Sequence, residues 1–232
     1  MITAEMLNQN ICGIAIGLRF DPTFAIGDNL GKIADKILYS KKSYFNPVFF
    51  PLVTSDINTI MLRDEARSKY LVISTTDIIL EVKLDINTDI NKTVLELEYE
   101  KQILNSILSV YQVRGIQRVG YLTKYKIKDK EISDIFCTKT GVEANNLSMR
   151  FQKTYPMPDS MIKRDVNDYC SNIYTIVKAA KLDELIIHSD YQIHYQPFLD
   201  NYEDIPFKTF LKTRNDFNEK QLLECLNKYL DR

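Results

Sequence analysis

The sequence predicts an α+β protein with a largely antiparallel sheet, helices packed on one face of that sheet, and a helix at the C-terminus. Segments rich in β-branched and aromatic residues come in runs, and short polar breaks separate them, as between antiparallel neighbours. Helical patterns fall between these runs rather than after every strand, which disfavours a doubly wound parallel fold. We expect one domain over residues 1–232. A strand-rich stretch followed by a helix occurs in each half, about 1–130 and 145–232, so two pseudo-repeated halves remain an alternative.

Composition and charge narrow the class of protein. The chain has 232 residues, of which 45% are apolar and 26% charged, the balance of a globular protein with a sizeable core. The formal net charge is −1, so the chain as a whole has no electrostatic attraction to nucleic acid or anionic lipid. The four cysteines are far apart and form no CxxC pair, which favours reduced cytosolic thiols over a disulfide framework or a zinc site.

Targeting and cofactor motifs are absent from the sequence. The first ten residues show no basic segment followed by an apolar run, and Ile11 to Leu18 is too short to span a bilayer. We therefore expect a cytoplasmic protein that does not interact with membranes. The sequence holds no GxxxxGK[ST] loop, GxGxxG motif or GxSxG elbow, so no cofactor is predicted.

The first half begins with a strand whose two faces differ. From Ile11 to Phe20, one face carries large apolar residues, whereas the other consists of Ile11, Gly13, Ala15, Gly17 and Arg19. We expect the next helix, with its apolar stripe from Ile26 to Leu38, to lie against the nearly bare face. Further strands are expected at Val48–Val53, Ile57–Leu62, Tyr70–Ser74 and Ile78–Leu84, followed by a helix over Glu96–Gln112.

The second half continues with strands and closes with a helix. Strands are expected at Arg118–Lys128, Leu147–Tyr155, Tyr169–Ala179 and Leu185–Tyr195, the last two as a pair joined by a turn. The C-terminal helix is signalled by Asn218 as N-cap and Gln221 three residues later, the spacing of a capping box.

One candidate catalytic site is the Glu-x-Lys segment Glu81-Val82-Lys83, inside an apolar strand, with Asp64 as an earlier acid. In metal-dependent nucleases with this pattern, two carboxylates hold Mg²⁺ and the lysine stabilises charge on the scissile phosphate. Period-2 alternation offers a simpler interpretation, in which Glu81 and Lys83 are the polar face of the strand. If the hairpins are antiparallel neighbours, Asp64 lies two strands from Glu81.

The chain's two histidines, His188 and His194, do not predict a metal site. They are six residues apart, which is roughly 20 Å along a strand at about 3.3 Å per residue. One ion does not bridge that distance, because its ligand bonds are about 2 Å long. The alternating polar residues from Glu184 to Gln196 indicate a solvated sheet face.

A candidate nucleic-acid surface is formed by Arg118, Lys124, Lys126 and Lys128, which alternate along one strand face. Such a row can contact successive phosphates. The alternative is an edge strand on which lysines prevent unwanted pairing.

Three further segments are distinctive: Leu18-Arg19-Phe20, the strand Ile116 to Leu122, and Ser189-Asp190-Tyr191. Together with the closing helix, they resemble a sporadically distributed family of uncharacterised bacterial proteins of about this length. The patchy distribution of that family implies mobile or defence islands, and hence a setting such as phage defence. The resemblance supplies no catalytic residues.

The function expected from the sequence is that of a non-enzymatic protein-binding or assembly module in a bacterial cytoplasmic complex. Aromatic and sheet-rich surfaces are abundant, and exposed strands or the C-terminal helix offer ways to bind a partner or a second copy. A Mg²⁺-dependent nuclease with Asp64, Glu81 and Lys83, and a nucleic-acid binder without catalysis, remain as alternatives.

Overall fold

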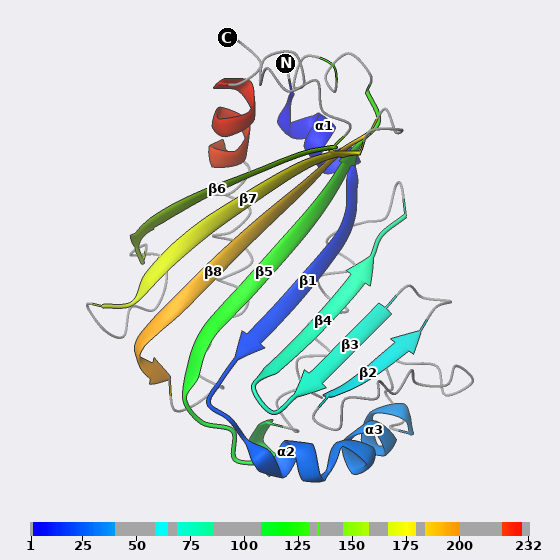
Figure 1. Ribbon diagram of the computed structural model, residues 1–232, viewed down its shortest axis with the longest axis vertical. Helices are drawn as coiled ribbons and strands as arrows, with labels where there is room; N and C mark the ends of the chain where they lie inside the picture. Colours follow the sequence, from blue (N-terminus) through cyan, green and yellow to red (C-terminus); the bar gives the residue numbers. More distant parts are fainter. Residues whose placement is uncertain are drawn as a thin grey trace.

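The architecture is a single eight-stranded sheet with a few helices (Figure 1). The computed structural model describes residues 2–39, 59–64, 69–85, 108–129, 134, 146–157, 167–179, 184–199 and 220–228. The strand order is β2-β3-β4-β1-β5-β8-β7-β6, and every neighbouring pair is antiparallel. The predicted α+β class with a largely antiparallel sheet is confirmed.

The strands lie close to their predicted positions. In chain order they are β1 (Ile11–Arg19), β2 (Thr59–Asp64), β3 (Lys69–Ser74), β4 (Asp77–Lys83), β5 (Ile116–Ile127), β6 (Asn146–Pro156), β7 (Tyr169–Ala179) and β8 (Leu185–Leu199). The predicted strand Val48–Val53 lies outside the described residues. Strands from both halves of the sequence belong to one sheet, because β5 pairs directly with β8.

The helices are short. They are α1 (Ala4–Gln9), α2 (Phe24–Asp28), α3 (Leu30–Leu38) and a C-terminal helix at residues 220–228. Residues 108–110 are also helical, and the rest of the predicted helix over Glu96–Gln112 that precedes them lies outside the described residues, as does the predicted cap Asn218. No helix in the described ranges is long and apolar enough to cross a membrane.

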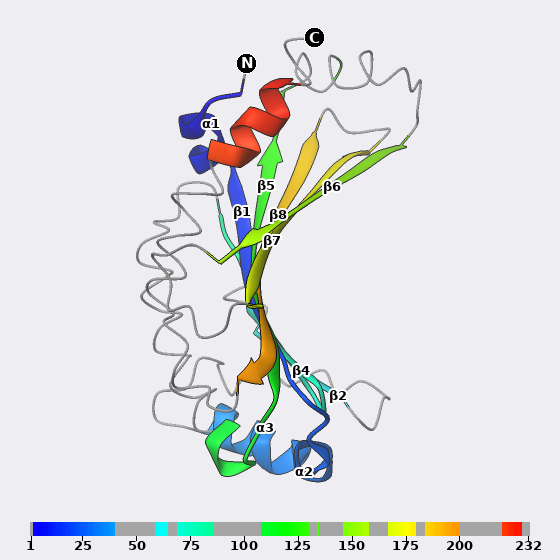
Figure 2. The ribbon, with the colours of Figure 1, turned by 90° about the vertical axis from the view of Figure 1, so that its left-hand side faces the viewer.

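One face of the sheet forms the hydrophobic core. Alternate residues of the strands point to it and are almost fully buried, among them Ile14, Leu80 and Ile187. Leu222 and Leu226 of the C-terminal helix belong to the same cluster. The side chain of Asn227 accepts a hydrogen bond from the backbone N–H of Ile2 and donates one to its carbonyl, both at 3.0 Å. The C-terminal helix therefore lies next to the segment that begins at Ile2 and leads into α1 (Figure 2).

The expected packing of a helix against the bare face of β1 is wrong. α3 contacts β2 at the lower end of the sheet in Figure 1, and its Ile33 and Ile37 join the core cluster. Ala15 and Gly17, on the bare face of β1, line an open hollow instead. Among the described residues, the face of the sheet opposite the core is therefore hollowed at β1.

Candidate functional site

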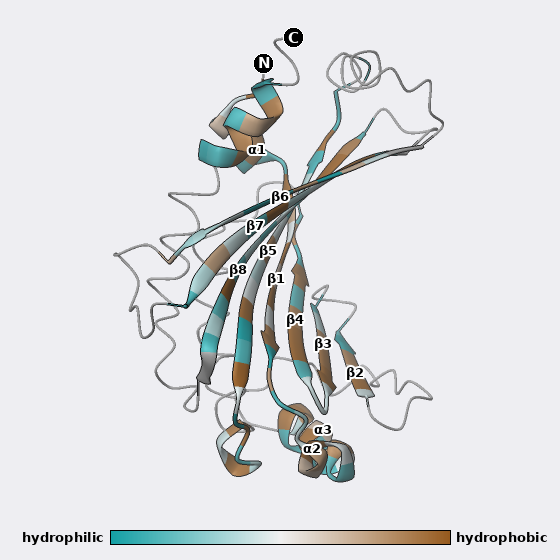
Figure 3. Ribbon diagram, turned by 60° about the vertical axis from the view of Figure 1, so that its left-hand side comes forward, coloured by the Kyte–Doolittle hydropathy of each residue, from teal (hydrophilic) through white to brown (hydrophobic). Residues whose placement is uncertain are grey.

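On the face opposite the core, charged, polar and small residues of the central strands lie side by side in rows that run across the sheet. Residues directly opposite each other in antiparallel strands share a face, so the register of the strand pairs defines each row. One row reads Asp77, Arg19, Arg118 and His194 from β4 to β8. The next reads Ile79, Gly17, Gly120 and Gln192, and the third Glu81, Ala15, Leu122 and Asp190. Figure 3 shows the alternation of hydrophobic and hydrophilic residues along these strands.

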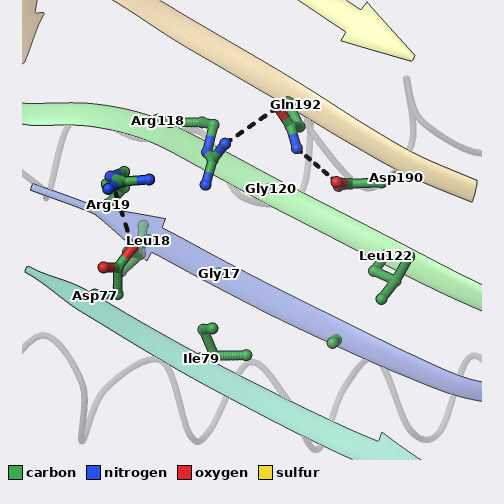
Figure 4. Close-up of a pocket in the computed structure, with 11 residues that line it drawn as sticks. Gly17, Leu18, Arg19, Asp77, Ile79, Arg118, Gly120, Leu122, Asp190 and Gln192 are labelled. Carbon is green, nitrogen blue, oxygen red and sulfur yellow. Dashed lines mark hydrogen bonds and ion pairs between the residues drawn. The ribbon is translucent and has the colours of Figure 1, made fainter. Parts of the chain in front are cut away.

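A hollow of about 160 Å³ lies over these three rows (Figure 4). Strands β1, β4, β5 and β8 all contribute to it. Its lining consists of Ala15, Gly17, Leu18, Arg19, Asp77, Ile79, Arg118, Gly120, Leu122, Asp190 and Gln192. Its volume is close to that of an engineered protein cavity of about 150 Å³ that binds benzene. The hollow is therefore large enough for a group the size of one amino-acid side chain.

The floor of the hollow is a pair of glycines. Gly17 and Gly120 are directly opposite each other on β1 and β5, in the middle of the sheet. A Cβ atom on Gly17 would meet no atom closer than Ile79 Cγ1 at 3.9 Å, and one on Gly120 would meet Asp190 Oδ1 at 3.6 Å. Both are ordinary van der Waals distances, so the fold leaves space above each glycine. Two paired residues without side chains produce the depression.

Other glycines of the chain serve the backbone. Gly115, just before β5, has a φ of +62°, a conformation that residues with a side chain rarely adopt, and a Cβ there would overlap the carboxylate of Asp21. A Cβ on Gly13 would lie 3.3 Å from the carbonyl oxygen of Val82, a tight contact. Gly17 and Gly120 meet neither constraint.

Charges of both signs surround the glycine floor. Arg19 Nε lies 3.9 Å from Asp77 Oδ1 on one side. On the other side, Arg118 Nη1 donates to Gln192 Oε1 at 3.5 Å, and Gln192 Nε2 donates to Asp190 Oδ2 (Figure 4). Burial raises the pKa of Asp190 above its usual value, although the bond from Gln192 and the charges of Arg118 and Arg150 lower it.

His194 lies beside the hollow and is held as a neutral ring. It stacks on Tyr169 with ring centroids 4.4 Å apart, and its Nε2 lies 3.1 Å from Ser171 Oγ. Burial, with a further contribution from the charge of Arg118, lowers the pKa of His194 to about 4. Near neutral pH the ring therefore adds no positive charge to the row that contains Arg19 and Arg118.

The three predicted nuclease residues are not brought together. Glu81 and Lys83 lie on the open face of β4, as alternation requires. Asp64 is on β2, two strands away, and through Lys69 it is in register with Val82 on the core face. Asp64 is fully buried on the opposite side of the sheet from Glu81. Two carboxylates on opposite faces do not share a metal ion, so this arrangement does not form the predicted Mg²⁺ site.

The lysines of the predicted row are paired with two neighbouring carboxylates. Lys124 Nζ contacts Glu81 Oε1 at 2.6 Å, and Lys126 Nζ contacts Glu184 Oε2 at 2.8 Å. Lys128 lies 3.8 Å from the other oxygen of Glu184. The expectation that these lysines protect an edge strand is wrong, because β5 lies between β1 and β8 and is paired on both sides. Arg118, the fourth member, belongs to the hollow instead.

The histidines behave as expected for separate residues of one strand. His188 is in register with Lys124, and His194 with Arg118, so three rows separate them. Burial, together with the charge of Lys124, lowers the pKa of His188. Within the described ranges, no group of three or more histidine, cysteine or acidic side chains is arranged to hold a metal ion.

Comparisons with known proteins identify no family: neither the protein-family models nor the curated proteins contain a match to this chain. Three sequence segments far apart in the chain nevertheless meet at the hollow. They contribute Arg19 from β1, Arg118 with Gly120 from β5, and Asp190 from β8.

Sequence reasoning did not identify the hollow as a site. The available signals were the small residues Gly13, Ala15 and Gly17 on one face of β1 and a lone glycine in the middle of the strand at Gly120. An isolated strand glycine indicates a bulge or the close approach of another group, so each of these signals could be interpreted from the sequence alone. That Gly17 and Gly120 are opposite each other follows only from the pairing of β1 with β5.

Proposed function

We propose that this chain is a non-enzymatic protein-binding module of a bacterial cytoplasmic complex, and that the open face of its sheet receives the partner. The hollow over Gly17 and Gly120 is the anchor point on that face. Concave sites with apolar walls and a few converging polar groups are the usual form of binding sites. Here Ile79 and Leu122 supply the walls, and arginine and aspartate side chains supply the polar groups.

The glycine pair is the observation that carries the proposal. Glycine in a strand interior weakens a sheet, and nothing in the contacts of Gly17 or Gly120 requires it. A cost in stability without a structural reason is typical of positions kept for function. Space directly above the backbone, bounded by charged side chains, is suited to the close approach of a partner group.

The charges of the open face favour a protein partner over nucleic acid. Lys124 and Lys126 are paired with carboxylates at 2.6 and 2.8 Å, so their charges are already compensated. Nucleic-acid affinity depends on basic groups that neutralise phosphates. A face with both signs in close alternation instead resembles the polar surface through which proteins recognise one another.

The proposal that the protein works in a bacterial complex, with phage defence as its role, is supported by the family resemblance described in the sequence analysis. We also infer that the helices are confined to the core face, which leaves the hollow uncovered. A hydrogen bond from Asn172 Nδ2 to Gln221 Oε1 at 2.9 Å supports this, because Asn172 is buried on the core face of β7.

The experiment is affinity capture of the tagged chain from its host, with wild-type protein compared to Gly120→Val. Valine suits a strand but fills the hollow. Thr154→Val is the matched control, because Thr154 is exposed on the same face in the glycine row but on the edge strand β6. We expect a stoichiometric protein partner that is retained by wild type and Thr154→Val and lost by Gly120→Val. A wild-type chain that retains no protein, or a partner equally retained by Gly120→Val, contradicts the proposal.

A further inference from the structure

Two arginines lie directly opposite each other at one end of the hollow. Arg19 on β1 and Arg118 on β5 form a registered pair, and like charges in such a position destabilise a sheet unless an anion offsets them. The contact of Arg19 with Asp77 is long, at 3.9 Å, and the Arg19 side chain is 51% exposed, so this ion pair is weak. Within the described part of the chain, Arg118 has no carboxylate at ion-pair distance, and its bond to the neutral amide of Gln192 is 3.5 Å long.

The other end of the hollow offers an acceptor. Asp190 receives a bond from Gln192 at Oδ2, whereas its Oδ1 lies over Gly120, 3.6 Å from the position a Cβ would take. Between the arginines and Asp190, Gln192 lies along β8, and the rest of the surface is apolar, with Ile79 beside Gly17 on β4 and Leu122 after Gly120 on β5. A ligand that satisfies all three regions carries an anionic group, a small apolar body and an N–H donor, in that order.

We propose that the hollow binds the carboxyl-terminal residue of a partner polypeptide, with the terminal carboxylate on Arg118 and Arg19. The apolar side chain of that residue lies over Gly17 and Gly120 between Ile79 and Leu122, and a backbone N–H reaches Asp190. This inference rests on the proposed protein-binding function and specifies the partner group. Capture of a C-terminal carboxylate is a recurring mode of peptide recognition, and arginine is suited to it because its guanidinium donates two parallel hydrogen bonds.

The dimensions of the site agree with one residue. Arg118 and Leu122, the partner of Asp190 in register, are four residues apart on β5, about 14 Å at about 3.4 Å per residue. The side chain of Arg118 extends toward Gln192, which is in register with Gly120, and so covers part of that distance. The interval that remains is about two residues of strand, which suits a carboxylate, a side chain and an adjoining backbone amide.

The balance of charge favours a carboxylate over a phosphate. Two arginines line the hollow, and so do two acids, Asp77 and Asp190. A phosphate group carries up to two negative charges near pH 7, and the acids at either end would repel it. A group with one negative charge and a neighbouring N–H donor complements both the arginines and the acids of the hollow.

The test is a titration of ¹⁵N-labelled full chain with N-acetyl-Ala-Val bearing a free carboxylate, and with the same peptide as its C-terminal amide. The chain has seven glycines, whose amide signals fall in a sparse region of the spectrum. Signals of Gly17 and Gly120 report on the hollow, and that of Gly31 on α3, where no atom lies within 4 Å of a Cβ position, is the reference. We expect saturable shifts at Gly17 and Gly120, and about tenfold or greater weakening for the amide, because charge-assisted hydrogen bonds are lost.

Two variants assign the effect to the arginine. Arg118→Gln is expected to lower the affinity for the free-carboxylate peptide to the level of the amide peptide. Arg118→Lys is expected to restore part of that affinity. Lys83→Gln is the control with the same change in net charge, because Lys83 is exposed on the open face six residues along β4 from the Asp77 row. It is expected to leave the affinity unchanged.

Equal affinity for acid and amide, or shifts that spare Gly17 and Gly120, overturns the carboxylate site. Tighter binding of inorganic phosphate at the same signals also overturns it, in favour of a phosphate ligand. These results leave the proposed function to be judged by the separate capture experiment with Gly120→Val, which does not depend on the identity of the bound group.

Discussion

Replacement of both floor glycines by alanine tests whether they serve the fold or a ligand. In Gly17→Ala/Gly120→Ala, each new methyl group has its nearest neighbour at 3.9 or 3.6 Å, so the sheet accommodates both without displacement. Neither glycine has a positive φ. Alanine also restricts the unfolded chain more than glycine does, and at compatible positions this change stabilises a protein by about 0.4–1 kcal/mol. We therefore expect the double variant to be about 1–2 kcal/mol more stable than wild type.

Thermal or urea denaturation measures this effect directly. For a domain of this size, 1 kcal/mol corresponds to a shift in Tm of about 2–4 °C, so the expected increase is about 2–8 °C. The same variant should lose partner binding, because two methyl groups occupy the floor of the hollow. Higher stability with lower binding is the signature of glycines retained for function.

Two further glycine variants bracket this prediction. Gly115→Ala should destabilise the protein by about 2 kcal/mol or more, because it combines a φ of +62° with overlap on Asp21. The stability of Gly13→Ala should lie between that of Gly115→Ala and that of Gly17→Ala/Gly120→Ala, because its Cβ would lie 3.3 Å from a carbonyl oxygen. If Gly17→Ala/Gly120→Ala loses 1 kcal/mol or more, the glycines are needed for the twist of the sheet, and the argument from them to a binding site fails.

Three other predictions concern polar side chains outside the glycine pair. The hydroxyls of Thr123 and Ser189 are opposite each other on the core face and fully buried, and neither has a hydrogen-bond partner among the described residues. Thr123→Val should therefore stabilise the protein by about 1 kcal/mol in urea denaturation, whereas a loss of stability would indicate a bridging water. Because burial lowers the pKa of His194 in the folded protein to about 4, the stability linked to its neutral ring is fully present above about pH 6.5 and is lost as the pH falls toward 4. His194→Gln should therefore reduce the change in unfolding free energy over this pH range by about 2 kcal/mol, which is less than the full pKa shift gives because the ring is partly exposed. An unchanged pH profile would refute this. Asn227→Ala removes two bonds to Ile2 and should cost about 1–2 kcal/mol in the same assay; no measurable cost would mean that the helix is held by its apolar contacts alone.

The strands were predictable because each carries a strong local signal. Alternation of buried and half-buried residues along β5, from Ile116 to Ile127, is the period-2 pattern in its simplest form. The antiparallel hairpins β2–β3–β4 followed from their short polar breaks. The same hairpin order placed Asp64 two strands from Glu81, and this separation was also predictable.

The sheet order was not predictable from local signals. β1 lies between β4 and β5, and β5 pairs with β8, which begins near residue 185, so these contacts join segments far apart in the chain. Without that order, the lysines of β5 suggested an edge strand, although the strand is paired on both sides. Ion pairs such as Lys126 with Glu184 depend on the same long-range register and were also out of reach.

The bare face of β1 illustrates how the polarity of neighbouring positions decides what covers a glycine. A helix packs closely on strand glycines only when apolar residues surround them, because its own buried face is apolar. The neighbours of Gly17 and Gly120 include the polar side chains of Arg19, Arg118 and Gln192, which a helix would leave without water or partners. The hydrophobic core cluster of the described residues lies on the other face of the sheet, so Gly17 and Gly120 are not part of it. A group that enters this space must bring polar atoms for the arginines, and a chain terminus with its carboxylate and amide meets that requirement better than the side of a helix.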